Sequence, residues 1–492
     1  MQEGIKQMVC ATLLAPWIVA ACVAGAFAAT DAATNGQEQI APVEMSLDVC
    51  VNTALERNHS RPASRFALAA AEAQHRQVMS AYWPQASLKG AYEIMDEPRN
   101  YIFPSSKFTL PYGGSIAVNI PGVGTVPASE ITIPDQEIKL MDRESWYASL
   151  GVQWLLWDGG MRRGLKEQAL AGVDVAREGL RRTELAIVDD VTRLYYGAVM
   201  ARQIRQVGLD TLARMETTLN LTETMYKEGS GKVTKADYLD NKIMVETLRA
   251  AVAQLENNQE MAEAALAWTI GLEWNQSVRP SASDIPFEPL SANLQALVSD
   301  AYEFSPDWKS LEAGLRAGEG ALRAAKSGHY PKVALTGDLH KWWNDYDKGM
   351  ATDENKEGWT AGIGIELPLF QGFLTDGKVK EARARLGKLQ EERILLREGL
   401  GLQVRGIVMG LNAAAKRYQA TLDAMNASIE SRDLNARAYQ NELVETQDVI
   451  KSQLMESFMS AQHFKMRYDH AELRSRLNLV VGREVQRRLG GE

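Results

Sequence analysis

The chain contains only three cysteines among its 492 residues, and two of them, Cys10 and Cys22, lie in an apolar N-terminal segment. If that segment is removed, Cys50 stands alone and no disulfide can form within the chain. The six histidines are scattered, with no spacing that would gather them on one helix face. A metal site built from histidine and cysteine is therefore not expected.

Several other patterns are missing. After the N-terminus no run reaches the roughly 20 apolar residues that a spanning helix needs. The net charge is -9 with both signs interspersed, so no basic face is available for a nucleic acid. The sequence has no phosphate-binding loop, no serine nucleophile elbow and no His-Glu-x-x-His motif. Neither an enzyme nor a cofactor is expected.

The N-terminus is the one strongly apolar segment, and it predicts a secretory signal peptide at 1–28 with cleavage after Ala28, followed by a linker at 29–45. An alternative stays open, because Val19-Ala20-Ala21-Cys22 resembles a lipobox that would leave Cys22 as a lipidated N-terminus. Either interpretation predicts an exported protein.

The rest of the chain is duplicated. The second half matches the first at an offset of 247, pairing Pro84 with Pro331, and later at offsets of 213 and 211, pairing Tyr226 with Tyr439 and Asp237 with Asp448. The change from 247 to 213 means that the first copy carries an insertion of 34 residues. We predict tandem repeats at 46–276 and 290–485, a linker at 277–289 and a tail at 486–492.

Each repeat shows two segments with period-two alternation, which predicts strands at about 83–101 and 144–157 and at about 331–343 and 358–370. Aromatic residues cluster in and beside these segments, as they do at the interfaces of membrane barrels. We therefore favour barrel strands over a soluble sheet. The connections Ile102–Glu144 and Asn344–Glu357 are rich in polar residues, glycine and proline, and are expected to be loops.

A long heptad-like segment follows each strand pair, at about 164–226 and 375–439. No proline interrupts either one, and at 1.5 Å per residue each predicts a helix of roughly 95 Å. A short polar turn, at about 226–236 and 439–447, then reverses the chain into a partner helix. Each repeat therefore ends in a long helical hairpin whose tip is remote from the strands.

The tips carry the only candidate functional residues. Asp237 and Asp240 are spaced i, i+3 at the start of one helix, and Asp448 and Lys451 have the same spacing at the start of the other. Asp237 has two interpretations that stay open, as a helix cap or as a functional group. Repeated around an oligomer, these carboxylates would form a ring that attracts cations.

The order of these features resembles the TolC-type outer-membrane efflux protein family. The resemblance rests on SLDVCVNTALERNHS, the strand-to-helix joints LLWDGGMRRG and LPLFQGFLTDG, and the turns ending in ADYLD and QDVIK. It implies a mixed α+β membrane protein: a homotrimer with a 12-stranded outer-membrane β-barrel, four strands per chain, continued by a periplasmic α-helical coiled-coil barrel. The four strands independently argue for closure by further copies, because their edges would otherwise stay unpaired.

The resemblance also implies a function, an exit duct that works with a periplasmic adaptor protein and an inner-membrane transporter in efflux or type I secretion. At the tip it identifies Tyr439 and Asp237 as a bonded gate pair and Asp448 as an acid of the selectivity ring. Val444 and Lys451 stand where the family has an arginine and a second acid, which weakens the expected cation preference. The remaining alternative is a coiled-coil scaffold without channel activity. The exported substrate and the class of pump cannot be predicted.

Overall fold

The computed structural model describes residues 42–97, 100–109, 116–120, 124–128, 130–139, 143–229, 233–343 and 357–482. The predicted signal peptide, the lipidation candidate Cys22 and the C-terminal tail lie outside these ranges, as does most of the second strand connection. Among the described helices, none is both long enough and apolar enough to cross a membrane.

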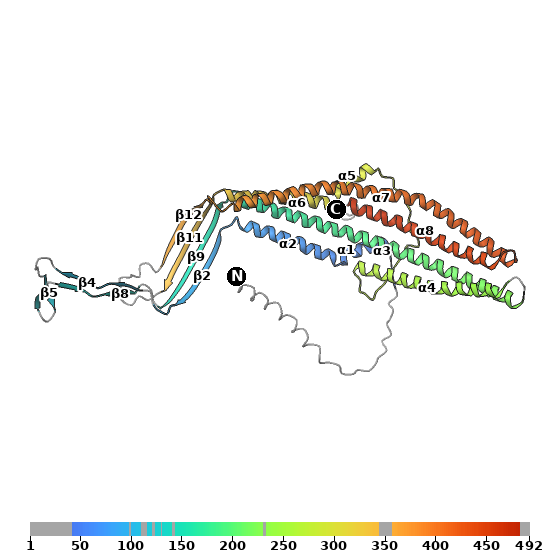
Figure 1. Ribbon diagram of the computed structural model, residues 1–492, viewed down its shortest axis with the longest axis horizontal. Coiled ribbons are helices and arrows are strands. Elements are labelled where there is room, and N and C mark those ends of the chain that lie inside the picture. Colours follow the sequence, from blue (N-terminus) through green and yellow to red (C-terminus); the bar gives the residue numbers. More distant parts are fainter. Residues whose placement is uncertain are drawn as a thin grey trace, which may run out of the picture. The chain divides into compact units, whose positions relative to one another are not determined.

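The duplication is visible in the element lengths, because each repeat contains helices of 11, 21, 67 and 36 residues in the same order (Figure 1). The first repeat comprises α1 (Leu47–Arg57), α2 (Ser60–Ser80), β2 (Gln85–Ile94), β9 (Glu144–Trp157), α3 (Met161–Lys227) and α4 (Lys235–Ile270). The second comprises α5 (Leu294–Phe304), α6 (Pro306–Lys326), the 3-10 turn Ser327–His329, β11 (Lys332–Trp343), β12 (Glu357–Glu366), α7 (Leu374–Gln440) and α8 (Thr446–Val481).

The four long strands form one antiparallel sheet in the order β12-β11-β9-β2. Its register places apolar residues opposite one another on one face: Leu88 lies opposite Leu150, which lies opposite Leu339. On the other face, Ser87 lies opposite Gly151 and Gly151 opposite Asp338. Because side chains alternate along a strand, one face is mainly apolar and the other mainly polar, as the period-two pattern predicts. The edge strands β2 and β12 are almost wholly exposed, whereas Ser145 and Ser149 on the polar face of the central strand β9 are buried.

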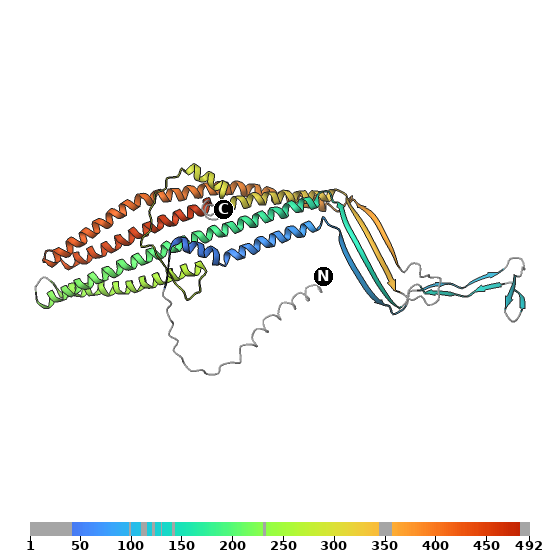
Figure 2. The same ribbon diagram turned by 180° about the vertical axis from the view of Figure 1, so that it is seen from behind.

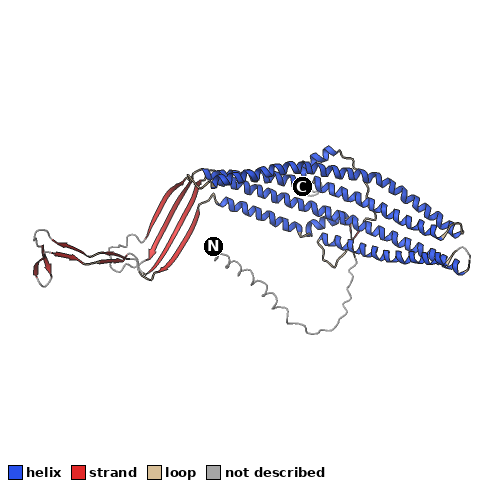
Figure 3. Ribbon diagram, in the orientation of Figure 1, coloured by secondary structure: helices blue, strands red, loops and turns tan. Residues whose placement is uncertain are grey.

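Two predicted strands end earlier than expected. β2 stops at Ile94 rather than near 101, and β12 stops at Glu366 rather than near 370. Pro368 follows β12 closely and has no N–H to donate to a ladder. Figure 3 shows that the four-stranded sheet lies apart from the long helices within Pro42–Glu492.

The insertion of the first repeat is not an irregular loop, which corrects the prediction for Ile102–Glu144. Its described residues form three successive antiparallel pairs: β3 (Asn100–Phe103) with β8 (Gln136–Lys139), β4 (Ser106–Thr109) with β7 (Glu130–Ile133), and β5 (Ile116–Ile120) with β6 (Gly124–Ala128). The first two pairs share one register across Pro104 and Pro134, which interrupt the ladder at adjacent positions. Short polar and proline-rich strands of this kind carry little periodic signal.

The two predicted linkers are structured where they meet. β1 (Val43–Met45) from the N-terminal linker pairs in parallel with β10 (Val278–Pro280) from the linker between the repeats. Val278 is fully buried in the largest core cluster, together with Cys50 of α1 and Val191 of α3. Burial raises the pKa of the Cys50 thiol to about 11, so this cysteine is structural.

Helix α3 is the centre of the helical part, because it packs against α2, α4, α6 and α8 (Figure 2). Its closest approach to α6 requires glycine on both sides. A Cβ at Gly164 would lie 2.5 Å from the Gly320 carbonyl oxygen, and one at Gly320 would lie 2.6 Å from that of Gly164. The repeats are therefore joined through backbone contact as well as through the β9–β11 ladder.

The joint between β9 and α3 is held by a buried ion pair. Asp158 accepts hydrogen bonds from the Gly160 N–H and from the N–H and Nε of Arg162, at 3.0, 2.9 and 2.8 Å. The Arg162 guanidinium also donates to the carbonyls of Leu155 and Leu156 at the end of the strand. The direction in which the strand enters the helix is thus set by side chains that are nearly inaccessible to solvent.

Candidate functional site

The candidate site lies where the two helical hairpins turn. α4 starts with a capping box, in which the Thr234 N–H donates to Asp237 Oδ2 (2.9 Å) and the Asp237 N–H donates to Thr234 Oγ1 (3.2 Å). The Thr234 hydroxyl also donates to the same carboxylate at 2.7 Å. Asp237 and Thr234 therefore satisfy each other's backbone amides at the start of α4, which is the capping interpretation.

Tyr439 is buried, with 4% of its surface exposed, at the end of α7. Its hydroxyl lies 2.8 Å from Thr222 Oγ1 on α3 and 3.0 Å from Thr446 Oγ1 on α8. Asn241 of α4 donates to the same Thr222 hydroxyl at 3.2 Å. All four long helices thus meet at one buried polar cluster.

This geometry corrects the predicted pair of Asp237 with Tyr439 within the chain. The tyrosine does bridge the two hairpins as expected, but its partner on the first hairpin is Thr222. The physical reason is local: the Asp237 carboxylate is already bonded to Thr234, and the tyrosine hydroxyl is enclosed by two threonines.

Two further polar contacts join the hairpins above the tip. Gln453 of α8 donates to Thr218 of α3 at 3.0 Å. Glu456, which is 6% exposed, accepts from Arg214 of α3 at 2.6 Å and lies 3.6 Å from the Arg432 guanidinium of α7. Together with the Tyr439 cluster, these contacts form an inter-hairpin lock, which comprises Arg214, Thr218, Thr222, Asn241, Arg432, Tyr439, Thr446, Gln453 and Glu456.

Sequence reasoning missed most of the lock, although a pattern for it exists. Thr211, Met215, Thr218 and Thr222 are buried at steps of 4, 3 and 4, which is the spacing of a heptad seam. On α8 the polar residues Gln453, Glu456, Ser460 and His463 are buried at steps of 3, 4 and 3. Polar residues at seam positions indicate specific partners across the helices, because a buried polar group is costly when it is left unpaired.

The other predicted residues lie on the surface. Asp240 and Lys451 line a groove of about 720 Å³ between α4 and α8, whose floor is apolar and includes Ile243, Met455 and Phe458. Asp448 is exposed in the first turn of α8. The structure therefore brings Asp240 and Lys451 together, while Asp237 and Tyr439 belong to separate sets of contacts.

Two buried histidines continue the α8 seam away from the tip. Burial lowers the pKa of His463, and the nearby Arg467 guanidinium lowers it further. Burial and Arg474 likewise lower the pKa of His470. Both imidazoles are therefore neutral at ordinary pH, and they pack against aromatic rings: His463 against Tyr418 and His470 against Phe287.

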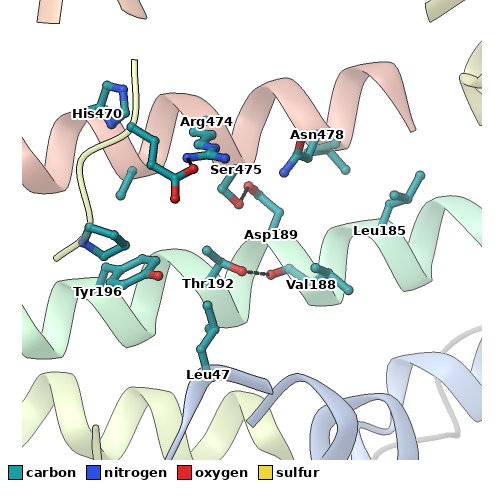
Figure 4. Close-up of a pocket in the computed structure, with 14 residues that line it drawn as sticks. Leu47, Leu185, Val188, Asp189, Thr192, Tyr196, His470, Arg474, Ser475 and Asn478 are labelled. Atoms are coloured by element: carbon teal, nitrogen blue, oxygen red, sulfur yellow. Dashed lines mark hydrogen bonds and ion pairs between the residues drawn. The ribbon is translucent and has the colours of Figure 1, made fainter. Parts of the chain in front are cut away.

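A cavity of about 250 Å³ lies between α3 and α8 beside the linker that joins the repeats (Figure 4). Asp189 projects from α3 and accepts a hydrogen bond from Ser475 of α8 at 2.6 Å, and burial raises the pKa of this carboxyl. Arg474 pairs with Glu288 of the linker at 2.5 Å. These polar groups largely satisfy one another, so they serve chiefly to attach the linker to the helices.

The side chains at the tip can make structural contacts between the hairpins. Among the residues that the structure describes, no group of three or more His, Cys, Asp or Glu could hold a metal ion. The lock joins side chains that are neutral or ion-paired and buried, and the surface around it carries unburied charges. Such an arrangement can hold the two hairpins together and leaves the charges around it exposed to solvent.

Comparison with known proteins finds the same family in both repeats. A family model described as outer membrane efflux protein matches residues 50–272 and 297–482, one stretch in each repeat. Protein CyaE of Bordetella pertussis is 24% identical over 274 residues, 55% of this chain and 56% of its own length. Outer membrane protein OprJ of Pseudomonas aeruginosa is 23% identical over 226 residues, 46% of each chain. The chain thus spans about half the length of these curated relatives.

The solved structures extend the likeness to nearly the whole fold. A membrane protein from Pseudomonas aeruginosa superposes with a TM-score of 0.71 over 89% of this chain and 93% of that chain, at 18% identity. At such low identity the likeness concerns the fold alone.

Proposed function

This chain belongs to the outer membrane efflux protein family, and on that premise we propose that it is a passive export duct in the outer membrane. Three copies close a barrel in the membrane, and their long helices continue it into the periplasm. Substrate arrives from an inner-membrane transporter through a periplasmic adaptor protein. The duct performs no covalent chemistry.

The observation that carries this proposal is the two-faced sheet joined directly to the 67-residue helices. One face presents Leu88, Leu339 and Trp359 in register, all more than half exposed, and this face suits lipid. The other face presents Ser, Thr, Gly and charged residues and suits a water-filled lumen. A soluble protein rarely leaves so large an apolar surface uncovered.

The long helices explain how the duct is shut. Each spans about 100 Å from its strand to its tip. The lock holds the hairpins of one chain together at that distant end, so we place the constriction at the tips. Adaptor and transporter belong to the proposal because an outer-membrane pore has no energy source of its own.

We expect purified protein in planar bilayers to give small, cation-favouring conductance steps, because the tips are closed by the lock and carry exposed carboxylates. The steps should grow when the lock is weakened. A stable trimeric preparation that stays electrically silent, even with the lock disrupted, would contradict the duct and favour a scaffold.

Charge at the tip should set ion preference without changing the size of the opening. Asp448 and Lys451 lie one turn apart on the exposed start of α8, so neither contributes a buried bond to the lock. We expect Asp448→Ala to lower the cation preference by about twofold or more, and Lys451→Asp to raise it. Reversal potentials in a salt gradient measure both. Glu391→Ala, on the exposed surface of α7 far from the tip, is the matched control and should change nothing.

A further inference from the structure

The linker between the repeats crosses the helices as a strap, which we define as residues 281–288. At α3 the strap is anchored by its backbone, since the Ala282 N–H donates to the Tyr195 hydroxyl at 3.1 Å. Ile285 is fully buried in the largest core cluster. The first half of the strap therefore belongs to the core of the first repeat.

Two arginines of α8 hold the second half of the strap. Arg467 pairs with Asp284 at 2.6 Å and also donates to the Ile285 carbonyl. Arg474 pairs with Glu288 at 2.5 Å. The strap thus ties α3 of the first repeat to α8 of the second.

Each of these arginines has a buried histidine one turn before it on α8. His463 precedes Arg467 by four residues, and His470 precedes Arg474 by four. The four side chains follow one another at steps of 4, 3 and 4, so they lie on one face of the helix. The two histidines are 2% and 1% exposed. We call these four residues the histidine row.

His463 packs between α8 and α7. Its ring centroid lies 5.2 Å from that of Tyr418, and its Nδ1 lies 3.3 Å from the Thr421 hydroxyl oxygen. The charged groups that act on it are Arg467 on α8 and Asp284 of the strap, which are paired with each other. The strap carboxylate that would favour a protonated His463 is therefore already engaged by an arginine.

His470 packs against the strap itself, with its ring centroid 4.4 Å from that of Phe287 (Figure 4). The charged groups that act on it, Arg474 and Glu288, are again paired with each other, and Asp189 of α3 lines the same cavity. Within the described residues, Nδ1 of His470 has no hydrogen-bond partner. A proton added there would create a buried donor without an acceptor, which is costly.

We propose that the histidine row is a pH-sensitive latch, in which acidification protonates His463 and His470 and detaches the strap from α8. Each new imidazolium lies one turn from an arginine, and like charges at this spacing on a helix repel. Burial opposes the charged form as well. Detachment exposes both rings to water and loosens the connection between the repeats. The latch goes beyond the proposed duct and does not depend on it.

The direction of the effect follows from proton binding. While the strap is attached, burial and the arginines lower the pKa of both histidines, and release returns each pKa toward the ordinary value of about 6.5. The released state then binds more protons, so attachment weakens as the pH falls below about 6.5. Each histidine shifts the equilibrium by up to about tenfold per pH unit until the pH reaches its lowered pKa.

The first repeat lacks the histidine row. The equivalent positions, 211 residues earlier, are Val252, Glu256, Gln259 and Glu263. Glu263 lies 3.5 Å from Arg279 at the start of the linker. This end of the linker is held without a histidine, so it should stay attached in mild acid.

Thiol labelling of Ile285→Cys tests the latch. A dithiodipyridine reagent reacts with thiols in acidic as well as neutral solution, and Ser291→Cys, at an exposed position of the linker, corrects for the effect of pH on the reagent. Relative to that control, we expect the labelling rate of Ile285→Cys to rise at least tenfold per pH unit below about 6.5. The chain without an added cysteine corrects for Cys50, which is buried.

Substitutions in the row identify the protons. His463→Gln and His470→Gln should each reduce the rise to no more than about tenfold per pH unit, and the double variant should show none, because glutamine stays neutral. Asp189→Asn is the matched control. It removes a buried titratable group beside the row and should leave the wild-type pH dependence unchanged.

Val278→Cys provides the control at the other end of the linker, where the side chain is also fully buried. It should stay protected from pH 7.5 to 5, since parallel labelling at both positions would mean that acid unfolds the core. That result would overturn the latch. So would a double histidine variant that keeps the wild-type pH dependence, or an Ile285→Cys chain that stays protected down to pH 5.

Hydrogen exchange of the strap amides in the unmodified chain, corrected for their intrinsic pH dependence, measures the same release without a substitution in the core. Exchange should accelerate below about pH 6.5 in residues 281–288 and not in the two histidine-free strands β1 and β10. An unchanged strap would contradict the latch. None of these measurements requires conduction, so their outcome is separate from that of the proposed duct.

Discussion

Replacement of Glu456 by alanine is expected to open the helical tip and to raise the mean conductance of the duct at least tenfold. The carboxylate is nearly inaccessible and lies between Arg214 of one hairpin and Arg432 of the other. Its removal takes away the carboxylate that Arg214 pairs with, while Arg432 keeps only its pair with Asp433 on its own helix. Breaking a buried ion pair from one side costs about 3–5 kcal/mol.

That cost acts on the equilibrium between closed and open tips. Each 1.4 kcal/mol changes such an equilibrium by about tenfold. Loss of the Glu456 pair in one chain should therefore raise the ratio of open to closed tips by a factor of roughly one hundred or more. Bilayer conductance measures the effect in vitro, and increased sensitivity of cells to large antibiotics measures it in vivo. Glu456→Gln keeps the size and part of the hydrogen bonding, and should give an intermediate conductance.

Two substitutions at the tip separate the lock from the helix cap. Tyr439→Phe removes the hydroxyl that joins Thr222 and Thr446, worth about 0.5–1.5 kcal/mol, and should raise conductance less than Glu456→Ala. Asp237→Ala removes only the cap of α4, worth about 1 kcal/mol locally, and should leave closure nearly unchanged. If Asp237→Ala opens the tip while Glu456→Ala does not, the lock is misplaced and the originally predicted aspartate is the gate.

Asp158→Ala is expected to lower the free energy of unfolding by about 3–5 kcal/mol, because it leaves the buried Arg162 guanidinium without its carboxylate. The loss should affect the whole assembly, since Arg162 also holds the end of β9 and donates to the Ala81 carbonyl after α2. The urea midpoint of the multimer, followed by circular dichroism and by gel mobility, measures it.

The second repeat offers the control for that experiment. Gln371 is the equivalent of Asp158, and its side chain accepts one hydrogen bond, at 3.3 Å, from the hydroxyl of Thr375, the equivalent of Arg162. Gln371 is exposed and uncharged, so Gln371→Ala should cost no more than about 1 kcal/mol. Equal losses from the two substitutions would mean that the buried ion pair has no special role in the joint.

The predictable part of the fold is the part encoded locally. The period-two segments became β2, β9, β11 and β12, and the uninterrupted heptads became α3 and α7, because a side chain's burial in a regular element follows from its position along that element. The insertion was misjudged for the same reason. Its strands have four or five residues each, too few for a period to be recognised, and proline interrupts them.

The candidate site was predictable only in outline. The tips and Tyr439 followed from the repeat and from the family resemblance, whereas Thr222, Glu456 and their partners did not. Thr222 and Tyr439 are 217 residues apart, and Arg214 and Glu456 are 242 apart. Which residues of α3 face which residues of α8 depends on how the two hairpins are staggered along their common axis.

By itself, the sequence determined the duplication, the element types and their order, and the two faces of the sheet, because each of these depends on the spacing of residues along the chain. Only the tertiary structure decided that Tyr439 meets Thr222 rather than Asp237 and that Glu456 is held between two arginines. A helix seam offers several polar residues at equivalent positions. The choice among their partners is made by the stagger of the packed helices and by which groups are already bonded locally, as Asp237 is to Thr234.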